Sequence, residues 1–274
     1  MTTTSSESCA KLSTKPGGGE TDFGFQRVAA EDHRGLVGAV FDSVAGRYDL
    51  MNDLMSGGLH RLWKQTLIDT LDPRPGMRLL DVAGGTGDVA FRAIERAETR
   101  AEIRGGSEDN PLVATICDPS EAMLDVARDR ALDQGLLRGI EFICAPAESL
   151  PFEDNSADAV TISFGLRNVT DRPAALAEMR RVLKIGGHLL CLEFSPAVLP
   201  VLVPLYDAYS YKILPWLGNK IAGDADSYQY LAESIRRFPP PDALSAELKA
   251  AGFGTIRHRM FSGGIVALHT AWRT

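Results

Sequence analysis

The sequence predicts an α/β fold built on a seven-stranded, mostly parallel sheet, and three observations predict it. From Met77 onward, apolar runs of strand length alternate with stretches whose apolar residues recur at helical spacing. The first run leads through a glycine-rich turn, residues 84–87, into a helix. The last two runs are separated only by Ser262 and Gly263, which predicts an antiparallel hairpin. With 274 residues, 45% of them hydrophobic, the chain can fill the core of one such domain.

The expected strands alternate with helices, and this alternation favours parallel pairing. Ser120 is expected to cap the helix after the second strand. Asp171 and Pro173 are expected to begin the helix after the fourth strand, and Gly186-Gly187 to end it. A polar stretch, residues 98–110, is predicted to be a surface loop, and residues 243–251 a helix before the terminal hairpin. The predicted strands are residues 77–83, 112–118, 140–144, 159–164, 189–194, 255–261 and 264–272.

Additional segments flank this sheet. Residues 1–22 are predicted to be a disordered tail, because the part up to Gly19 is rich in Ser, Thr and Gly and lacks the apolar stretch of a secretory signal. The folded domain is expected over residues 23–274 and begins with a helical arm, residues 34–72, laid against the mouth of the sheet. Residues 195–240, rich in Tyr, Pro and Leu, are predicted to form a helical lid over the substrate side. Helices that merely enlarge the core are the alternative.

Charge and composition disfavour several classes of protein. The net charge is −7 and no basic run occurs, which argues against a nucleic-acid partner. The four cysteines lack C-x-x-C spacing, and three of them lie in apolar strand runs, where a reduced, buried thiol is expected and no disulfide framework is indicated. The five histidines are scattered, so no metal site is expected. No apolar run reaches the roughly 18 residues that a membrane span needs.

The glycine-rich turn after the first strand is expected to hold a ligand. Glycines leave bare backbone that a ligand can approach closely, and the following helix start offers unpaired N–H groups that suit a phosphate or a carboxylate. The glycines are spaced G-G-x-G, which differs from the G-x-G-x-x-G of dinucleotide-binding proteins. Asp118 at the end of the second strand suits a ribose diol in either class, so it does not decide between them.

Four segments together resemble one family. They are residues 81–88 (DVAGGTGD), 163–170 (SFGLRNVT), 206–210 (YDAYS) and 226–235 (DSYQYLAESI). They resemble the quinone C-methyltransferases of ubiquinone and menaquinone synthesis, which are class I S-adenosylmethionine (SAM) methyltransferases with a Rossmann-like fold, and the likeness spans residues 23–272. The first segment alone indicates only a class I methyltransferase, whereas the second and fourth are more specific. The resemblance implies SAM as the cofactor and a polyprenyl quinol as the substrate, and it leaves open whether the ring is a benzoquinol, a naphthoquinol or both.

The resemblance also implies which residues contact SAM. The glycine turn would take the methionine end, Asp118 the ribose diol, and the N–H of Ala147 an adenine ring nitrogen. Pro146 departs from the family, which usually has Asn or Asp there. Because proline has no side-chain acceptor, the contact to the adenine amine is expected to be lost or taken over by Glu148. Pro119 is expected to stiffen the ribose-binding turn. The full set of expected SAM contacts is Gly85, Thr86, Gly87, Asp118, Pro146, Ala147 and Ser163.

Candidate catalytic residues follow the fourth strand, on the carboxyl side where ligands bind in open α/β sheets. C-methylation of a phenol-like ring requires that a ring hydroxyl lose its proton. Arg167 is expected to stabilise the resulting phenolate or to orient a water acting as the base, and Asn168 to hold a ring oxygen. The alternative is that Arg167 pairs with an acid such as Asp171. Further candidates for catalysis or for the quinol pocket, with core aromatics as the alternative, are Tyr48, Tyr206 and Tyr209.

Other functions stay open at this point. They are a methyltransferase of another lipid or small-molecule acceptor, a non-catalytic scaffold of a quinone-synthesis complex, and an NAD-dependent dehydrogenase, which the glycine spacing and the terminal hairpin disfavour. Because a polyprenyl quinol resides in the bilayer, the protein is expected to be cytoplasmic and peripheral on the inner membrane, or on the matrix side in a mitochondrion. A homodimer or a quinone-biosynthesis complex is left open as the assembly.

Overall fold

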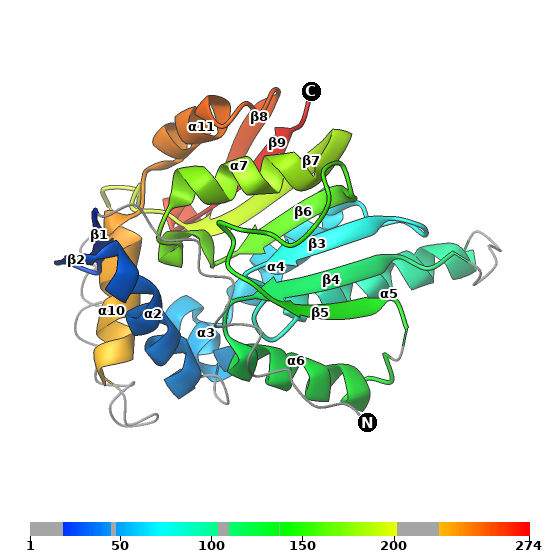
Figure 1. The fold of residues 1–274 in the computed structure, drawn as a ribbon, viewed down its shortest axis with the longest axis horizontal. Helices are drawn as coiled ribbons and strands as arrows, with labels where there is room; N and C mark the ends of the chain where they lie inside the picture. Colours follow the sequence, from blue (N-terminus) through cyan, green and yellow to red (C-terminus); the bar gives the residue numbers. More distant parts are fainter. Residues whose placement is uncertain (1–18, 45–47, 104–109, 137, 202–224) are drawn as a thin grey trace.

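The central sheet is the framework of the molecule (Figure 1). The computed structural model describes residues 19–44, 48–103, 110–136, 138–201 and 225–274. The seven strands of this sheet lie in the order β5-β4-β3-β6-β7-β9-β8. They are β3 (Arg78–Val82), β4 (Val113–Asp118), β5 (Ile140–Cys144), β6 (Ala157–Ser163), β7 (Leu183–Phe194), β8 (Ile256–Phe261) and β9 (Val266–Trp272). Neighbouring strands are parallel from β5 to β7, and β9 runs antiparallel to both β7 and β8. The predicted sheet and its terminal hairpin are thereby confirmed.

The order of the strands reverses beside β3. From β3 the chain continues outward through β4 to β5, and it then returns to β6 on the other side of β3. Leu80 of β3 pairs with Thr115 of β4 on one side and with Val160 of β6 on the other. The crevice at the carboxyl ends of strands that diverge in this way is the usual ligand site of open parallel sheets.

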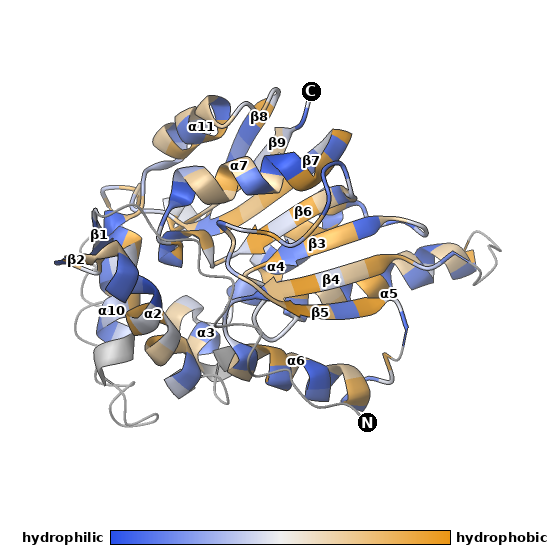
Figure 2. Cartoon of the chain, in the orientation of Figure 1, coloured by the Kyte–Doolittle hydropathy of each residue, from blue (hydrophilic) through white to orange (hydrophobic). Residues whose placement is uncertain are grey.

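Helices cover both faces of the sheet, because alternate residues of a strand point to opposite sides. Leu79 packs in one core cluster with buried residues of α4 (His60–Leu71), α5 (Asp88–Ile103) and α6 (Glu121–Asp133). Leu80 and Val82 pack in the other with α7 (Arg172–Val182) and α11 (Pro241–Ala250). Figure 2 accordingly shows the central strands mostly hydrophobic, whereas the edge strand β8 carries polar residues.

A further group of elements lies at the carboxyl ends of the strands, at the left of Figure 1. It comprises the hairpin of β1 (Glu20–Phe23) and β2 (Gln26–Ala29) with the helices α2 (Ala30–Val44), α3 (Tyr48–Ser56) and α10 (Ala225–Arg237). The hairpin begins inside the segment predicted to be a disordered tail, so regular structure starts earlier than expected. The helical arm also begins earlier, at Ala30. Of the predicted lid, the structure describes residues 195–201 and α10, and residues 202–224 lie outside the described residues.

Helix caps agree with the sequence, and two element boundaries do not. Ser120 caps α6 and Asp171 caps α7, each accepting a hydrogen bond from a backbone N–H of the first turn. Helix α5 continues to Ile103, into the stretch predicted to be a loop. Its buried apolar residues keep helical spacing from Val89 to Ala97, and the helix continues beyond this packed part. Strand β7 begins at Leu183, directly after α7, and contains the glycine pair that was expected to separate the two.

Two other expectations concern cysteines and membrane spans. Cys117 and Cys191 are free and buried, as expected. Cys144 on β5 is disulfide-bonded instead, so the expectation of a reduced thiol is wrong there. Among the described helices, none combines the length and the apolar content that a membrane crossing requires.

Candidate active site

A pocket opens at the carboxyl ends of β3, β4 and β6, and α2 forms its roof. Its cavity volume is about 140 Å³, and it opens to solvent. Apolar side chains from α2 and α6 face backbone turns and a single buried carboxylate across it. The lining includes Val37, Phe41, Ala83, Gly85, Asp118, Ser120, Met123, Pro146, Ala147, Glu148, Phe164, Gly165 and Asn168.

The glycine turn forms one wall because its backbone adopts conformations that side chains disfavour. Gly85 and Gly87 have φ values of 54° and 83°, and a Cβ on Gly87 would lie 2.7 Å from the ring of Phe91. Ala83 and Phe164, two non-glycine residues that line the pocket, also have positive φ values, 49° and 58°. Such strained backbone conformations occur at functional sites more often than elsewhere. The turn therefore brings bare backbone close to the pocket, as predicted.

Asp118 is the buried acid of the pocket. Its Oδ2 accepts a hydrogen bond from the N–H of Gly85, and its Oδ1 one from the N–H of Ser120, both at 2.9 Å. Burial raises the pKa of Asp118 to about 6, against these two backbone donors, which lower it. Each carboxylate oxygen retains a lone pair for a ligand hydroxyl. The carboxylate thus links the turns after β3 and β4 and presents an acceptor to the pocket.

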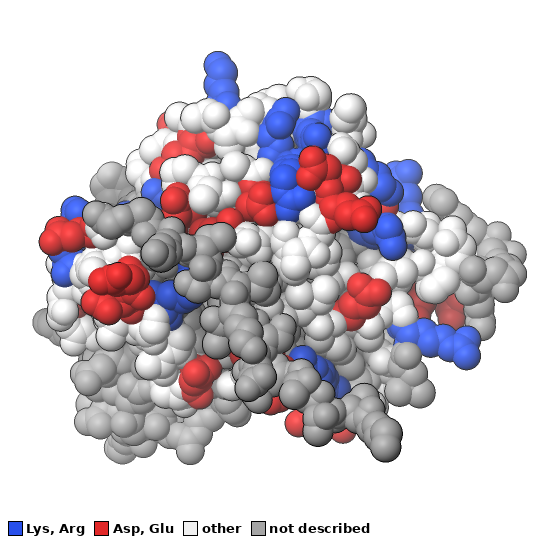
Figure 3. Space-filling model, in the orientation of Figure 1, with Lys and Arg blue, Asp and Glu red and all other residues white. Residues whose placement is uncertain are grey.

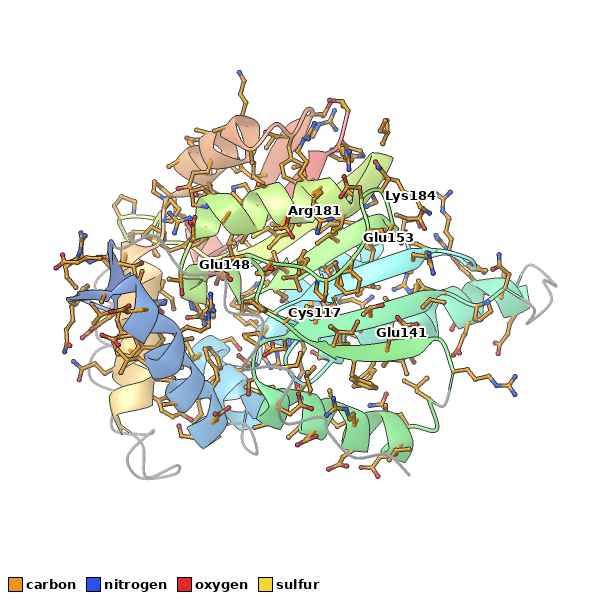
Figure 4. The ribbon with its side chains drawn as sticks, viewed as in Figure 1. Cys117, Glu141, Glu148, Glu153, Arg181 and Lys184 are labelled. Atoms are coloured by element: carbon orange, nitrogen blue, oxygen red, sulfur yellow. The ribbon has the colours of Figure 1, made fainter. Side chains whose placement is uncertain are left out.

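The far wall is formed by the turn after β5. Pro146, Ala147 and Glu148 line it. Glu148, labelled in Figure 4 beside the start of α7, accepts hydrogen bonds through Oε1 from the N–H groups of Thr170 and Asp171, at 3.0 and 3.2 Å. One oxygen of Glu148 is therefore already engaged in holding the loop after β6. That the adenine amine bonds to the other oxygen of Glu148, rather than losing this contact, stays a prediction.

The structure brings together some of the expected SAM contacts and not others. Gly85, Asp118, Pro146 and Ala147 line the pocket, and Thr86, Gly87 and Ser163 are not among its lining residues. The hydroxyl of Thr86 accepts a hydrogen bond from Arg130 at 2.8 Å, and the hydroxyl of Ser163 is buried and has no hydrogen-bond partner within the described part of the chain.

Arg167 is buried in an ion pair, so the alternative raised from the sequence applies, with a different acid. Its Nη1 lies 2.7 Å from Oε1 of Glu193, and the two side chains are only 3% and 2% exposed. The same Nη1 donates to the carbonyl of Phe164 at 2.6 Å, and the guanidinium lies over the ring of Phe194. Arg167 does not line the SAM-side pocket, whereas the next residue, Asn168, does.

The tyrosines expected near the substrate are placed only in part. Tyr48 begins α3, and its side chain lies outside the described residues. Tyr206 and Tyr209 fall in the segment 202–224, which also lies outside them.

Sequence reasoning missed three features of the site. The roof residues of α2, such as Phe41, were not singled out because an amphipathic helix shows no sign of the ligand that it covers. Glu193 is a charged residue at the end of an apolar strand, and this signal alone predicts a buried partner. Tyr230 lies in one of the four family segments and donates a hydrogen bond to Oδ1 of Asn168 at 3.1 Å.

The fold and the pocket together define a class I SAM-dependent methyltransferase. The chemistry of the lining suits SAM: Asp118 would accept from the ribose diol, the apolar side chains of Val37, Phe41 and Met123 would pack on the adenine, and the bare glycine turn would take the methionine end. Solved structures share the fold. A SAM-dependent methyltransferase from Thermotoga maritima, described as a possible histamine N-methyltransferase, matches 87% of this chain and all of its own with a TM-score of 0.57 at 18% identity. A putative SAM-dependent methyltransferase from Methanococcus maripaludis matches 85% of this chain and 93% of its own with a TM-score of 0.58 at 16% identity.

The particular family follows from sequence comparison. Residues 27–273 match the model of the ubiE/COQ5 methyltransferase family. The ubiquinone/menaquinone biosynthesis C-methyltransferase UbiE of Brucella abortus is 51% identical over 94% of this chain and 92% of its own length. The UbiE of Brucella anthropi is likewise 51% identical, over 94% of both chains. The chain belongs to the ubiE/COQ5 methyltransferase family, and its cofactor is SAM.

Proposed function

We propose that this enzyme transfers the methyl group of SAM to a ring carbon of a polyprenyl quinol in ubiquinone synthesis, menaquinone synthesis or both. One observation carries the proposal: relatives that are 51% identical over 94% of the chain carry the name of that activity. The geometry supports it, because Asn168 and the 3₁₀ turn η2 (Leu166–Asn168) stand at the carboxyl end of β6, beside the pocket that fits SAM.

The chemistry joins a ring carbon to a methyl group. Bound SAM supplies an activated methyl on a sulfonium. A water molecule acting as the base would take the proton of a ring hydroxyl; the neighbouring carbon would then form the new C–C bond while the S–CH₃ bond breaks and leaves the neutral thioether S-adenosylhomocysteine. The methylated carbon would then lose its hydrogen as a proton to water, which restores the aromatic ring and the hydroxyl. The attacking carbon must lie in line with the S–CH₃ bond. The protein therefore contributes chiefly by holding the acceptor in that position and by stabilising the phenolate.

In this proposal, Asn168 and Arg167 have different roles in holding the acceptor and in stabilising the phenolate. Asn168 lines the pocket and carries a side-chain N–H that can donate to a ring oxygen. Arg167 lies behind it, and its bond to the carbonyl of Phe164 fixes the turn. Glu193 offsets much of its positive charge, and in this proposal the remainder favours negative charge on the acceptor. In this proposal Tyr48, Tyr206 and Tyr209 contribute to the quinol pocket.

The direct test is methyl transfer with the purified protein. A demethylated benzoquinol and a demethylated naphthoquinol with short prenyl tails are kept reduced, and methylated product is measured by mass spectrometry with SAM present or withheld. Product with either quinol supports the proposal and assigns the ring class. Transfer only to a phospholipid amine offered in parallel would favour the alternative acceptor, and SAM binding without transfer to any of them would favour a scaffold.

We also propose that the enzyme works peripherally on a membrane, at the cytoplasmic face of the inner membrane or its mitochondrial equivalent. Four large apolar side chains near η5 (Ser262–Gly264) are 43 to 82% exposed: Leu62, Leu199, Val201 and Met260. Hydrogen bonds to η5 from Trp63, next to Leu62, and from Leu199 bring these segments together. The net charge of the chain is −7, so attraction to anionic lipid does not favour docking, and apolar contact is the better source of docking energy. On the face drawn in Figure 3, acidic and basic groups adjoin along α7.

Vesicle flotation tests this docking. Binding to neutral phosphatidylcholine vesicles, retained at high salt and reduced by Leu62→Ser and Val201→Ser, supports it. Recovery of the protein only in the unbound fraction would contradict it. Light scattering of the same samples decides between a monomer and the homodimer, and co-purification of other quinone-synthesis enzymes tests the complex.

A further inference from the structure

The side-chain amide of Asn168 is held between two groups. Its Oδ1 lies 3.1 Å from the hydroxyl of Tyr230, which donates to it. Its Nδ2 lies 3.5 Å from the carbonyl oxygen of Phe164. These two neighbours come from α10 and from the end of β6, and they approach the amide from different elements.

The chemistry of the neighbours fixes which way the amide points. The carbonyl of Phe164 is an acceptor that already receives the Nη1 of Arg167 at 2.6 Å. An amide oxygen facing that carbonyl would place two acceptors side by side, so the NH₂ group must face it. The oxygen of Asn168 then faces Tyr230. One N–H of the NH₂ group points toward Phe164, and the other is left for the pocket that Asn168 lines.

Tyr230 is itself held rigidly. It is 5% exposed, and its ring stacks on Phe23 of β1 with centroids 4.3 Å apart and an interplanar angle of 21°. The hairpin is tied to the same helix, since Glu233 accepts a hydrogen bond from the N–H of Phe25 at 3.0 Å. Burial raises the pKa of the Tyr230 hydroxyl, which therefore stays protonated and remains a donor throughout the working pH range.

We propose that Tyr230 is a positioning residue, whose hydroxyl orients the amide of Asn168 so that an N–H faces the oxygen of the acceptor ring. This inference rests on the proposed function, in which Asn168 is the residue that contacts the acceptor. Without the hydroxyl, the amide is held only by the long contact of Nδ2 with the carbonyl of Phe164, at 3.5 Å, and that carbonyl already accepts from Arg167. The terminal torsion of Asn168 is soft, so the amide then presents oxygen as well as nitrogen to the substrate. The phenolate then meets repulsion in part of the population.

Tyr230→Phe keeps the ring and its stacking on Phe23 and removes only the hydroxyl. We expect kcat for quinol methylation to fall about 3- to 10-fold, the range for one lost hydrogen bond, with the Kd of SAM unchanged. Ser234→Ala is the matched control on α10, because that hydroxyl bonds to its own helix at Leu231 and does not reach Asn168. The control is expected to keep the wild-type kcat.

A double-mutant cycle separates positioning from general structure. In an Asn168→Ala background, Tyr230→Phe is expected to have no further effect on kcat, because the group through which it acts is gone. An equal fall of kcat in both backgrounds, or a wild-type kcat in Tyr230→Phe alone, would overturn the proposal.

A readout without turnover keeps the inference separate from the proposed function. Heteronuclear NMR of isotope-labelled protein resolves the side-chain NH₂ of Asn168, assigned by its loss in Asn168→Ala. We expect slowed exchange and one orientation in the wild type, and averaging in Tyr230→Phe but not in Ser234→Ala. Identical amide signals in all three proteins would reject the inference. Failure of the wild-type enzyme to methylate any quinol, with the NMR difference present, would reject the proposed function alone.

Discussion

Asp42 on α2 accepts a hydrogen bond through Oδ1 from the hydroxyl of Ser120, at 2.7 Å across 78 residues of sequence. Ser120 caps α6, and its N–H donates to Asp118. The roof of the pocket is therefore tied by a side chain to the turn that holds the carboxylate of Asp118, although α2 belongs to the N-terminal arm and Asp118 to the central sheet.

Removing this tie should weaken SAM binding more than it weakens the fold. Asp42→Ala is expected to raise the Kd of SAM about 3- to 10-fold by calorimetry, the range for one hydrogen bond, with little change in Tm. Asp32→Ala, which removes another exposed acid of the same helix, is the control and should leave the Kd unchanged. A Kd of wild-type value in both variants would show that the roof does not need this bond.

The raised pKa of Asp118 predicts a pH dependence of SAM binding. Its pKa is about 6 in the folded protein because the carboxyl is buried. The ionised carboxylate is the stronger acceptor for the ribose hydroxyls, so affinity should rise as the pH increases through about 6 and level off above it. The α-carboxyl and α-amino groups at the methionine end of SAM titrate on either side of this range, so they do not account for a change near pH 6.

Calorimetric titrations of SAM on either side of the pKa of Asp118 check this dependence. In Asp118→Asn the affinity is expected to be low and independent of pH across the same range, because the titrating group is gone. A wild-type affinity that rises toward acid pH would contradict the role of the carboxylate.

The pair of Lys64 and Asp88 predicts a stability effect of defined sign. Lys64 Nζ on α4 lies 2.9 Å from Asp88 Oδ2 at the start of α5, and the Lys64 side chain is 6% exposed. Burial raises the pKa of Asp88, but Lys64 and Arg92 lower it more, and the net shift is downward. Lys64→Met is expected to cost about 2–3 kcal/mol of unfolding free energy at neutral pH, since Asp88 is left half-paired.

Because the folded-state pKa of Asp88 is depressed, this contribution is present above the unfolded-state pKa, about 4, and is lost as the pH falls below it. Urea titrations of wild type and Lys64→Met should therefore converge in acid. Arg61→Ala on the same helix removes an exposed ion pair with Asp53 and is expected to cost under about 0.5 kcal/mol. A gap between wild type and Lys64→Met that stays constant into acid would contradict this account.

The central sheet and part of the pocket wall were predictable from local sequence. The apolar runs and the glycine spacing identify strands that are buried on both faces. Because the carboxyl ends of parallel strands lie at the same edge of a sheet, the sequence alone predicts that Asp118 and Gly85 lie close together, and they are hydrogen-bonded. Ser120 marks the start of its helix in the sequence, because a capping hydroxyl accepts a hydrogen bond from a backbone N–H in the first turn of the same helix. These features depend on neighbours in sequence.

The remainder depends on contacts between distant segments. Strands β1 and β2 are four residues each, too short for a periodic signal, and Phe23 is held by stacking on Tyr230 of α10. The sequence indicates an acidic partner for Arg167 but does not identify it as Glu193. That choice is set by the register of β6 and β7, in which Ser163 lies opposite Leu192 and so brings Glu193 beside the turn. Register between strands is a tertiary property that a single sequence does not state.

The buried pair of Arg167 and Glu193 gives the sharpest test of the catalytic assignment, because stability and turnover should separate. Arg167→Met leaves Glu193 buried without its partner, 2% exposed, and is expected to cost about 3–5 kcal/mol of unfolding free energy. The same variant should lose turnover about 100-fold or more, since positive charge behind the phenolate is removed. Taken alone, that loss does not distinguish catalysis from partial unfolding.

Adding Glu193→Gln to Arg167→Met removes the unpaired charge and keeps one side-chain oxygen, which can accept from the N–H of Phe194 as Oε1 of Glu193 does. The longer contact of Oε2 with the N–H of Arg167, at 3.3 Å, is given up. The double variant is expected to regain most of the lost stability and to bind SAM with wild-type affinity, yet to remain as inactive as the single one. Urea titration, calorimetry and quinol methylation on the three proteins decide the matter. If turnover returns together with stability, then the charge of Arg167 serves the fold, and the stabilisation of the phenolate must come from Asn168 and the backbone of the turn instead.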